Sequence, residues 1–310
     1  MKLKTGERYL NLKKVVLFSA LSISLFHITA FAETSSADLS NNGLNAQSAT
    51  LTASHDESTN HNFTSLNLTL SPSELRWIGS RIYANECASK PENLIIWGQG
   101  EEFPSLGIGH FIWYPKDFKG PFVETFPDMV AYVSQYKTAP LWLKTLEPFS
   151  APWSSKEAFL KAVDSKDMAL LRQWLLATQT YQTQYISLEL NKRFNDYLST
   201  NNDLNKTAII LVFNQLMQTK EGRFALIDYV NFKGMGAENE QYQGEQWGLI
   251  SVLKPLALMS FHLMDSQQLL QAFVDSAKQR LNLRVELSPK VRNEQRWLKG
   301  WFKRLDGYLK

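Results

Sequence analysis

The chain contains little of the material from which disulfides and metal centres are built. Its 310 residues include one cysteine and five histidines, so a disulfide within the chain is excluded and a metal centre is not expected. The sequence also has no phosphate-binding Gly-x-x-x-x-Gly-Lys-Ser/Thr loop, no dinucleotide-binding fingerprint and no His-Glu-x-x-His zinc motif. We therefore expect a protein that works without a metal or a cofactor.

An excess of positive charge is missing from most of the chain. The formal net charge is +3, but residues 1–32 alone carry +4 and the remainder carries −1. Domains that bind nucleic acid carry a basic surface, so nucleic acid is not an expected partner. After residue 30 no apolar run approaches the roughly 20 residues that a membrane-spanning helix needs. No stable span is therefore expected once the N-terminal segment is removed.

Residues 1–32 have the composition of a secretory signal peptide. A basic start is followed by the apolar run 15–30, and Ala30-Phe31-Ala32 places small residues where signal peptidase reads them, with cleavage before Glu33. An uncleaved anchor is the alternative, although the apolar run is short for a span and His27 interrupts it. The sequence thus predicts an exported bacterial protein, periplasmic or secreted.

Composition divides the rest of the chain in two. Residues 33–70 are rich in Ser, Thr, Asn and Ala, which is typical of a flexible segment. From residue 71 to residue 310 large apolar residues return, and most segments show helical periodicity. We expect helices over residues 121–135, 155–163, 166–177, 180–198, 204–217, 266–281 and 289–308, with an irregular connection at 140–153. The predicted fold is one mainly α domain, which we expect to be monomeric.

The first helix of this domain places an acid on its inward face. Ser71 as N-cap, Pro72 at the first helical position and Glu74 three residues after the cap form a capping box. An apolar stripe follows at helical spacing, made up of Leu75, Ile78 and Ile82. Glu86 lies four residues further on and shares that face. Apolar surroundings disfavour a charged carboxylate, so we expect Glu86 to hold a proton, as a general acid must. The alternatives are that it turns outward or pairs with Arg81.

A β-prone, glycine-rich turn follows, Ser105-Leu106-Gly107-Ile108-Gly109-His110. Together with Glu86 it resembles the active-site signature of phage-type lysozymes, in which a helix-terminal Glu precedes a small hairpin reading Thr-Ile-Gly-Ile-Gly-His or close to it. The resemblance implies a lysozyme-like helical domain with a small β-hairpin beside the catalytic helix. It also implies a peptidoglycan or related amino-sugar polymer as substrate, Glu86 as general acid, Ser105 as the residue that holds the attacking water, and His110 at the substrate.

The second carboxylate is less defined. The family has an Asp six residues before the Thr of its motif, where this chain has Gln99, and the nearest acids are Glu101 and Glu102. Either acid could support an oxocarbenium-like centre or activate water. If neither reaches the cleft, a lytic transglycosylase that uses Glu86 alone becomes the better interpretation. A chitosanase-like enzyme fits the same residues, and a non-catalytic glycan-binding envelope protein is the alternative from another class.

A second polar region lies between residues 228 and 249. Two glycine-rich turns, at 228–234 and 243–249, flank a polar loop. Sugar-binding clefts use amide side chains for hydroxyl groups and aromatic rings for apolar sugar faces. The candidates for substrate binding are therefore Tyr229, Asn231, Gln246 and Trp247, and residues 246–249 are expected to open a helix. An ordinary loop between helices is the alternative.

Four other residues could contribute to a site. Cys87 follows the proposed acid directly, but a nucleophilic cysteine needs a nearby His or another cation. None is close in sequence, so we interpret Cys87 as a small buried hydrophobe. His262 lies in an apolar run and is expected to be a core residue. In the C-terminal helix, Arg292 and Arg296 could reach a carboxylate of the cleft.

Overall fold

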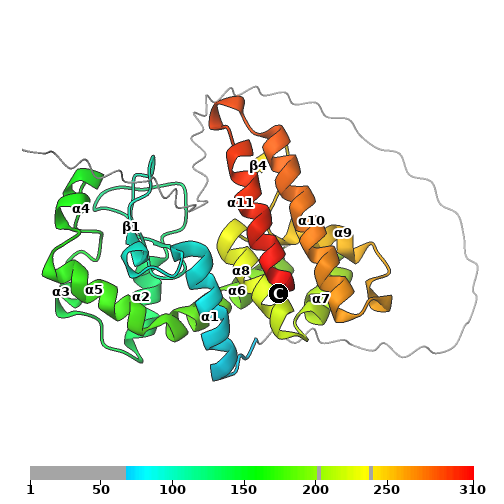
Figure 1. Ribbon diagram of the computed structural model, residues 1–310, viewed down its shortest axis with the longest axis horizontal. Coiled ribbons are helices and arrows are strands. Elements are labelled where there is room, and N and C mark those ends of the chain that lie inside the picture. Colours follow the sequence, from blue (N-terminus) through cyan, green and yellow to red (C-terminus); the bar gives the residue numbers. More distant parts are fainter. Residues whose placement is uncertain (1–67, 201–203, 237–239) are drawn as a thin grey trace, which may run out of the picture.

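The computed structural model describes residues 68–200, 204–236 and 240–310 (Figure 1). The predicted signal peptide and residues 33–67 of the predicted flexible segment lie outside the described residues. Leu68 is buried in the hydrophobic core. Packing therefore begins before residue 71, where the composition changes.

The prediction of a mainly helical protein with a small antiparallel sheet is confirmed. One side of the molecule, the N-terminal lobe, consists of a small sheet and short helices, with the first helix at its edge (Figure 1). These elements are α1 (Pro72–Cys87), η1 (Pro91–Leu94), β1 (Ile95–Ile96), β2 (Ser105–Leu106), β3 (Phe111–Ile112), α2 (Phe126–Ser134), α3 (Leu141–Lys144), α4 (Lys156–Ala162) and α5 (Lys166–Ala177).

A long helix, α6 (Gln179–Thr200), runs from the N-terminal lobe to the second, C-terminal lobe (Figure 1). The C-terminal lobe consists of packed helices and a two-stranded hairpin. Its elements are α7 (Lys206–Leu216), α8 (Lys220–Lys233), β4 (Gln241–Tyr242), β5 (Glu245–Gln246), α9 (Leu249–Ala257), η2 (Phe261–Leu263), α10 (Ser266–Leu287), η3 (Lys290–Arg292), α11 (Gln295–Asp306) and η4 (Gly307–Leu309).

The predicted start of α1 is confirmed in detail. The side chain of Ser71 accepts a hydrogen bond from the backbone N–H of Glu74 at 3.3 Å, and the carboxylate of Glu74 accepts one from the backbone N–H of Ser71 at 3.0 Å. The apolar stripe of α1 is buried, and Glu86 is buried with it. A Cβ at Gly79 would lie 2.4 Å from Oγ1 of Thr183, so glycine lets α1 approach α6 closely. The sequence therefore fixes both the start and the inward face of this helix.

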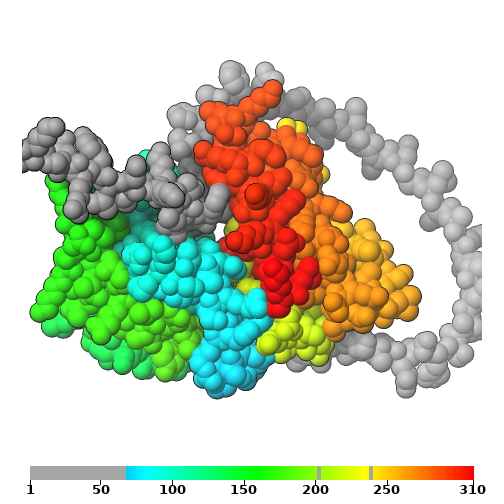
Figure 2. Space-filling model, viewed as in Figure 1, coloured from blue at the N-terminus to red at the C-terminus, as the bar shows by residue number. Residues whose placement is uncertain are grey.

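The two lobes also meet where α1 contacts the end of the chain (Figure 2). Arg81 of α1 donates to the carbonyl oxygens of Gly307 at 3.1 Å and Lys310 at 2.7 Å. These contacts hold Arg81 at the C-terminus, and Glu86 has a different cationic partner, described below.

The small sheet carries the glycine-rich turn. Strand β2 lies between β1 and β3, and both pairings are antiparallel, with Leu106 opposite Ile95 on one side and Phe111 on the other. Gly107 adopts a positive φ of 74°, which favours glycine. The backbone N–H of Ile108 donates to Oε1 of Gln182 at 2.9 Å. This contact fixes the turn against α6.

Three predictions of local structure are wrong. Helix α2 begins at Phe126 rather than near residue 121, because Pro in its first turn starts a helix there. Residues 228–233, predicted as a turn, are the end of α8, and only Gly234 leaves the helix. Their polar side chains are buried against other helices, which a local reading of polarity cannot anticipate. His262 is exposed in η2 rather than part of the core.

Among the residues that the structure describes, none of the helices combines the length and the apolar character that crossing a membrane requires.

Candidate active site

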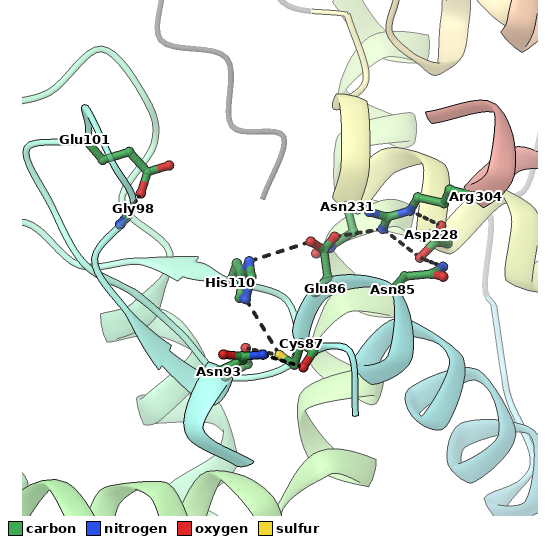
Figure 3. A network of polar contacts seen from close by, with 11 residues as sticks. Asn85, Glu86, Cys87, Asn93, Gly98, Glu101, His110, Asp228, Asn231 and Arg304 are labelled. Atoms are coloured by element: carbon green, nitrogen blue, oxygen red, sulfur yellow. Dashed lines mark hydrogen bonds and ion pairs between the residues drawn. The ribbon is translucent and has the colours of Figure 1, made fainter. Parts of the chain in front are cut away.

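The buried carboxylate of Glu86 lies at the centre of a polar network between the lobes (Figure 3). Only 6% of Glu86 is exposed. Its Oε1 accepts hydrogen bonds from Nδ2 of Asn231 at 3.0 Å and from a terminal nitrogen of Arg304 at 2.7 Å. Its Oε2 lies 3.6 Å from Nδ1 of His110. Side chains from α1, α8, α11 and the glycine-rich turn thus converge on one acid.

Local structure explains why these side chains point toward one another. Helix α1 ends at Cys87, one residue after Glu86, because Ala88 takes a left-handed φ of 51°. On α8, Asp228 and Asn231 are three residues apart and therefore share one face. That face meets α11, which brings Arg304 to both Asp228 and Glu86.

Asp228 is the main partner of Arg304. Its carboxylate accepts from Nε of Arg304 at 2.7 Å and from a terminal nitrogen at 2.8 Å. It also accepts from the hydroxyl of Tyr308 at 2.7 Å and from Nδ2 of Asn85 at 3.3 Å. Burial by itself lowers the pKa of Arg304, but the carboxylates of Asp228 and Glu86 outweigh it and raise that pKa above its usual range. Arg304 is therefore a permanent cation in this site.

His110 bridges Glu86 and Cys87. Its Nε2 lies 3.6 Å from Sγ of Cys87, and 3% of the residue is exposed. Burial lowers the pKa of His110 despite the neighbouring Glu86, which favours the neutral imidazole. Burial also raises the pKa of the Cys87 thiol well above its usual value. The predicted burial of Cys87 is confirmed. The fold nevertheless places a histidine beside it, which the sequence did not indicate, while a thiol that keeps its proton is a poor nucleophile.

A cavity of about 650 Å³ opens beside this network. His110 and Asn231, the two neutral partners of Glu86, line it, and the carboxylate of Glu86 lies behind them. Residues from both lobes form its walls, with aromatic and aliphatic side chains covering most of the surface. Its charged lining residues are Glu189, Arg193, Lys233, Glu240 and Arg284. A cavity of this size and position can hold a ligand against the network.

No relative was found. The chain matches none of the protein families, curated proteins or solved structures with which it was compared. The assignment of function therefore depends on the side chains of the site and on the physical chemistry of their contacts.

The structure separates the predicted second carboxylates from Glu86. Glu101 lies on the β1–β2 loop, on the far side of His110 from Glu86 (Figure 3). Its carboxylate accepts from the backbone N–H of Gly98 at 3.0 Å, and burial raises its pKa to about 7. Glu102 is exposed. Neither residue lines the cavity, and no contact of either carboxylate with Glu86 is found in the described part of the chain.

Ser105 lies in the central strand of the sheet, and only 1% of it is exposed. Within the described part of the chain its hydroxyl has no hydrogen-bond partner, and Ser105 is not among the residues that line the cavity. Its assigned role, holding the attacking water, stays a prediction.

The predicted substrate-binding residues divide into two groups. His110, Asn231 and Trp247 line the cavity, whereas Tyr229 and Gln246 do not. The buried hydroxyl of Tyr229 donates to the carbonyl oxygen of Trp247 at 2.8 Å. Tyr229 therefore holds the backbone just before α9. Trp247 lines the cavity, and the guanidinium of Arg284 lies 4.2 Å from the centre of its ring.

Sequence reasoning missed Arg304 and Asp228 and selected the wrong arginines of the C-terminal segment. Arg292 pairs with the buried Glu294 at 2.8 Å, and Arg296 stacks on Trp297. A usable signal was present on α8, where Asp228 and Asn231 share a face at helical spacing. The prediction of a turn over residues 228–233 conceals this helical spacing.

Within residues 68–200, 204–236 and 240–310, no three His, Cys, Asp or Glu side chains are grouped in a way that could hold a metal ion.

Proposed function

We propose that this protein is an exported enzyme that cleaves the β-1,4-glycosidic bonds of peptidoglycan or a related amino-sugar polymer, with Glu86 as general acid. The observation that supports this most is the arrangement around Glu86. A buried acid at the end of a helix lies beside a glycine-rich hairpin and a cavity between two lobes. The resemblance of the Glu86 and 105–110 motifs to phage-type lysozymes supplies the substrate class.

The contacts of Glu86 support its proposed role. Arg304 is matched by Asp228, which accepts two of its N–H groups and is completely buried. Arg304 and Asn231 also donate to Oε1 of Glu86, whereas Oε2 faces His110. In the proposed mechanism the transferred proton is therefore carried on Oε2.

In the proposed mechanism, Glu86 gives this proton to the glycosidic oxygen as the bond to C1 breaks. Asn231 and Arg304 hold Oε1 and so orient the carboxyl group. The neutral imidazole of His110 does not compete for the proton, because its pKa is lowered by burial. Trp247, which is almost completely buried, adds apolar surface to the wall of the cavity.

A lytic transglycosylase is the second candidate, and one observation favours it. The residues that line the cavity beside Glu86 do not include Glu101 or Glu102, the acids expected to activate water. A transglycosylase needs no such acid, because a hydroxyl of the substrate itself attacks C1. The products separate the two reactions, since hydrolysis adds water and transglycosylation yields an anhydro sugar.

The test is cleavage of purified peptidoglycan by the wild type, E86Q and the matched control E92Q, whose side chain is exposed on η1. We expect E86Q to lose about 10²–10⁴-fold in turnover and still to bind the polymer, and E92Q to match the wild type. Cleavage by E86Q at the wild-type rate would refute the assignment. Polymer binding without cleavage by any of the three proteins would instead favour a non-catalytic glycan-binding protein.

A further inference from the structure

Glu240 is an acid of the cavity that the proposed mechanism does not use. It lines the cavity and is mostly buried. Its carboxylate lies over the end of α8, where its Oε2 is 3.0 Å from the position that a Cβ at Gly234 would occupy. Glycine at 234 leaves room for this carboxylate, so the end of α8 and the start of the β4–β5 hairpin together position an acid at the cavity wall.

The end of α8 contacts both acids. Asn231 in its last turn donates to Glu86, and Gly234, three residues later, adjoins the carboxylate of Glu240. Asn231, Gly234 and Glu240 all line the cavity. The end of α8 thus links Glu86 to an acid of the cavity wall.

The other acids near the cavity are less suited to act with Glu86. Glu189 lines the cavity but pairs with Arg193 on the same helix, with 3.3 Å between Oε2 and Nε. Glu245, on β5, lies outside the cavity lining and pairs with Arg280 at 2.7 Å. Among the described carboxylates that line the cavity, only Glu240 adjoins the turn of α8 that holds Glu86.

The surroundings of Glu240 suit a base. Burial raises its pKa, while Arg284, Lys233 and Arg193 act in the opposite direction and favour its charged form. A carboxylate with a raised pKa accepts a proton more readily than one in water. Lys233 is itself buried, and no hydrogen-bond partner for its Nζ is found in the described part of the chain. Three cationic side chains thus act on the charge of Glu240, and no ion pair with its carboxylate is found among the residues that the structure describes.

We infer that Glu240 is the second catalytic carboxyl group of this site, the general base that activates water; this inference rests on the proposed function. Glu240 takes one proton from a water molecule in the cavity as its oxygen bonds to C1. The bond from C1 to the glycosidic oxygen breaks, its electron pair stays on that oxygen, and Glu86 supplies the proton that completes the new hydroxyl. One water is consumed for each bond cleaved, and solvent returns the proton from Glu240 to Glu86.

The experiment compares the wild type with E86Q, E240Q, E189Q and the control E245Q on soluble peptidoglycan chains. We expect E240Q to lose at least 100-fold in kcat with little change in KM, while E245Q matches the wild type. The products of the wild type should carry a reducing end rather than an anhydro sugar. Thermal unfolding of each variant shows whether it is folded.

A second measurement keeps a folding defect from being mistaken for a catalytic one. Azide added to E240A can attack C1 in place of the activated water, so we expect azide to restore turnover and to yield a glycosyl azide that mass spectrometry detects. If azide restores nothing, Glu240 acts only on structure and the inference is wrong. Near-normal turnover by E240Q would overturn it as well, as would loss of activity in E189Q alone. If the wild type cleaves nothing, the proposed function itself fails.

Discussion

The balance of charge among Asp228, Arg304 and Glu86 gives the sharpest prediction. D228N keeps the size of the side chain but removes the negative charge that matches Arg304. The carboxylate accepts four hydrogen bonds, two from Arg304 and one each from Tyr308 and Asn85. In the variant one oxygen becomes an NH₂ group, which cannot accept. We expect Arg304 to turn to its remaining acid, Glu86, which is already 2.7 Å away.

The magnitude follows from the burial of the pair. Removing one partner of a buried ion pair destabilises a protein by about 3–5 kcal/mol. Because Glu86 can replace the negative charge that Arg304 loses, we expect D228N to fall near the lower end of this range. Its free energy of unfolding should decrease by about 3 kcal/mol. As Arg304 turns toward Glu86, it displaces the carboxyl group that it orients, so we expect turnover to fall by about 10²-fold. D228N should therefore be folded but much less active.

The assay is a double-mutant cycle with R304M, read by urea unfolding and by cleavage of peptidoglycan. R304M alone leaves Asp228 buried without its cation and should cost about 3–5 kcal/mol. In D228N/R304M neither charge remains, so the loss should be smaller than the sum of the two single losses by about 2 kcal/mol. The double variant should not recover activity relative to D228N, because it also lacks Arg304, which orients Glu86. Additive stabilities, or a fully active D228N, would refute the reasoning.

Two further predictions concern the hairpin side of the site. Burial raises the pKa of Glu101 from 4.5 to about 7, so the folded state binds the proton of this carboxyl group more tightly than the unfolded state does. The protonated carboxyl group therefore stabilises the fold fully below pH 4.5, and this stabilisation is lost as the pH rises toward 7. E101Q should therefore gain stability relative to the wild type over that interval in unfolding titrations, and a constant difference would contradict this. In G109A, the new Cβ would lie 2.9 Å from the ring of Phe111 and 3.0 Å from Oδ1 of Asn231, so it would crowd both the ring and the amide that donates to Glu86. We expect activity to fall at least tenfold while the melting temperature drops by a few degrees, and unchanged turnover would show that Asn231 does not orient the acid.

Local sequence determined much of the framework of the site. The capping box at Ser71 and the apolar stripe after it fixed the start of α1 and the inward direction of Glu86, because both depend on residues within one or two turns. Glycine at 107 allowed the tight turn that presents His110. Most of the helices of the C-terminal half were likewise predicted from periodicity, with ends shifted by a few residues.

Only the tertiary structure determined which charges meet. Asp228 and Arg304 are 76 residues apart, and Glu86 and Arg304 are 218 apart, so no local pattern pairs them. The polarity of residues 228–233 resembled that of a turn because their partners lie on other helices. The approach of Glu240 to Gly234 depends in the same way on how the β4–β5 hairpin packs on α8. The sequence alone thus placed one acid on the inward face of a helix. The packing of α8 and α11 against that helix decided the charges around it, because the energy of a buried charge depends on every neighbour within a few ångströms.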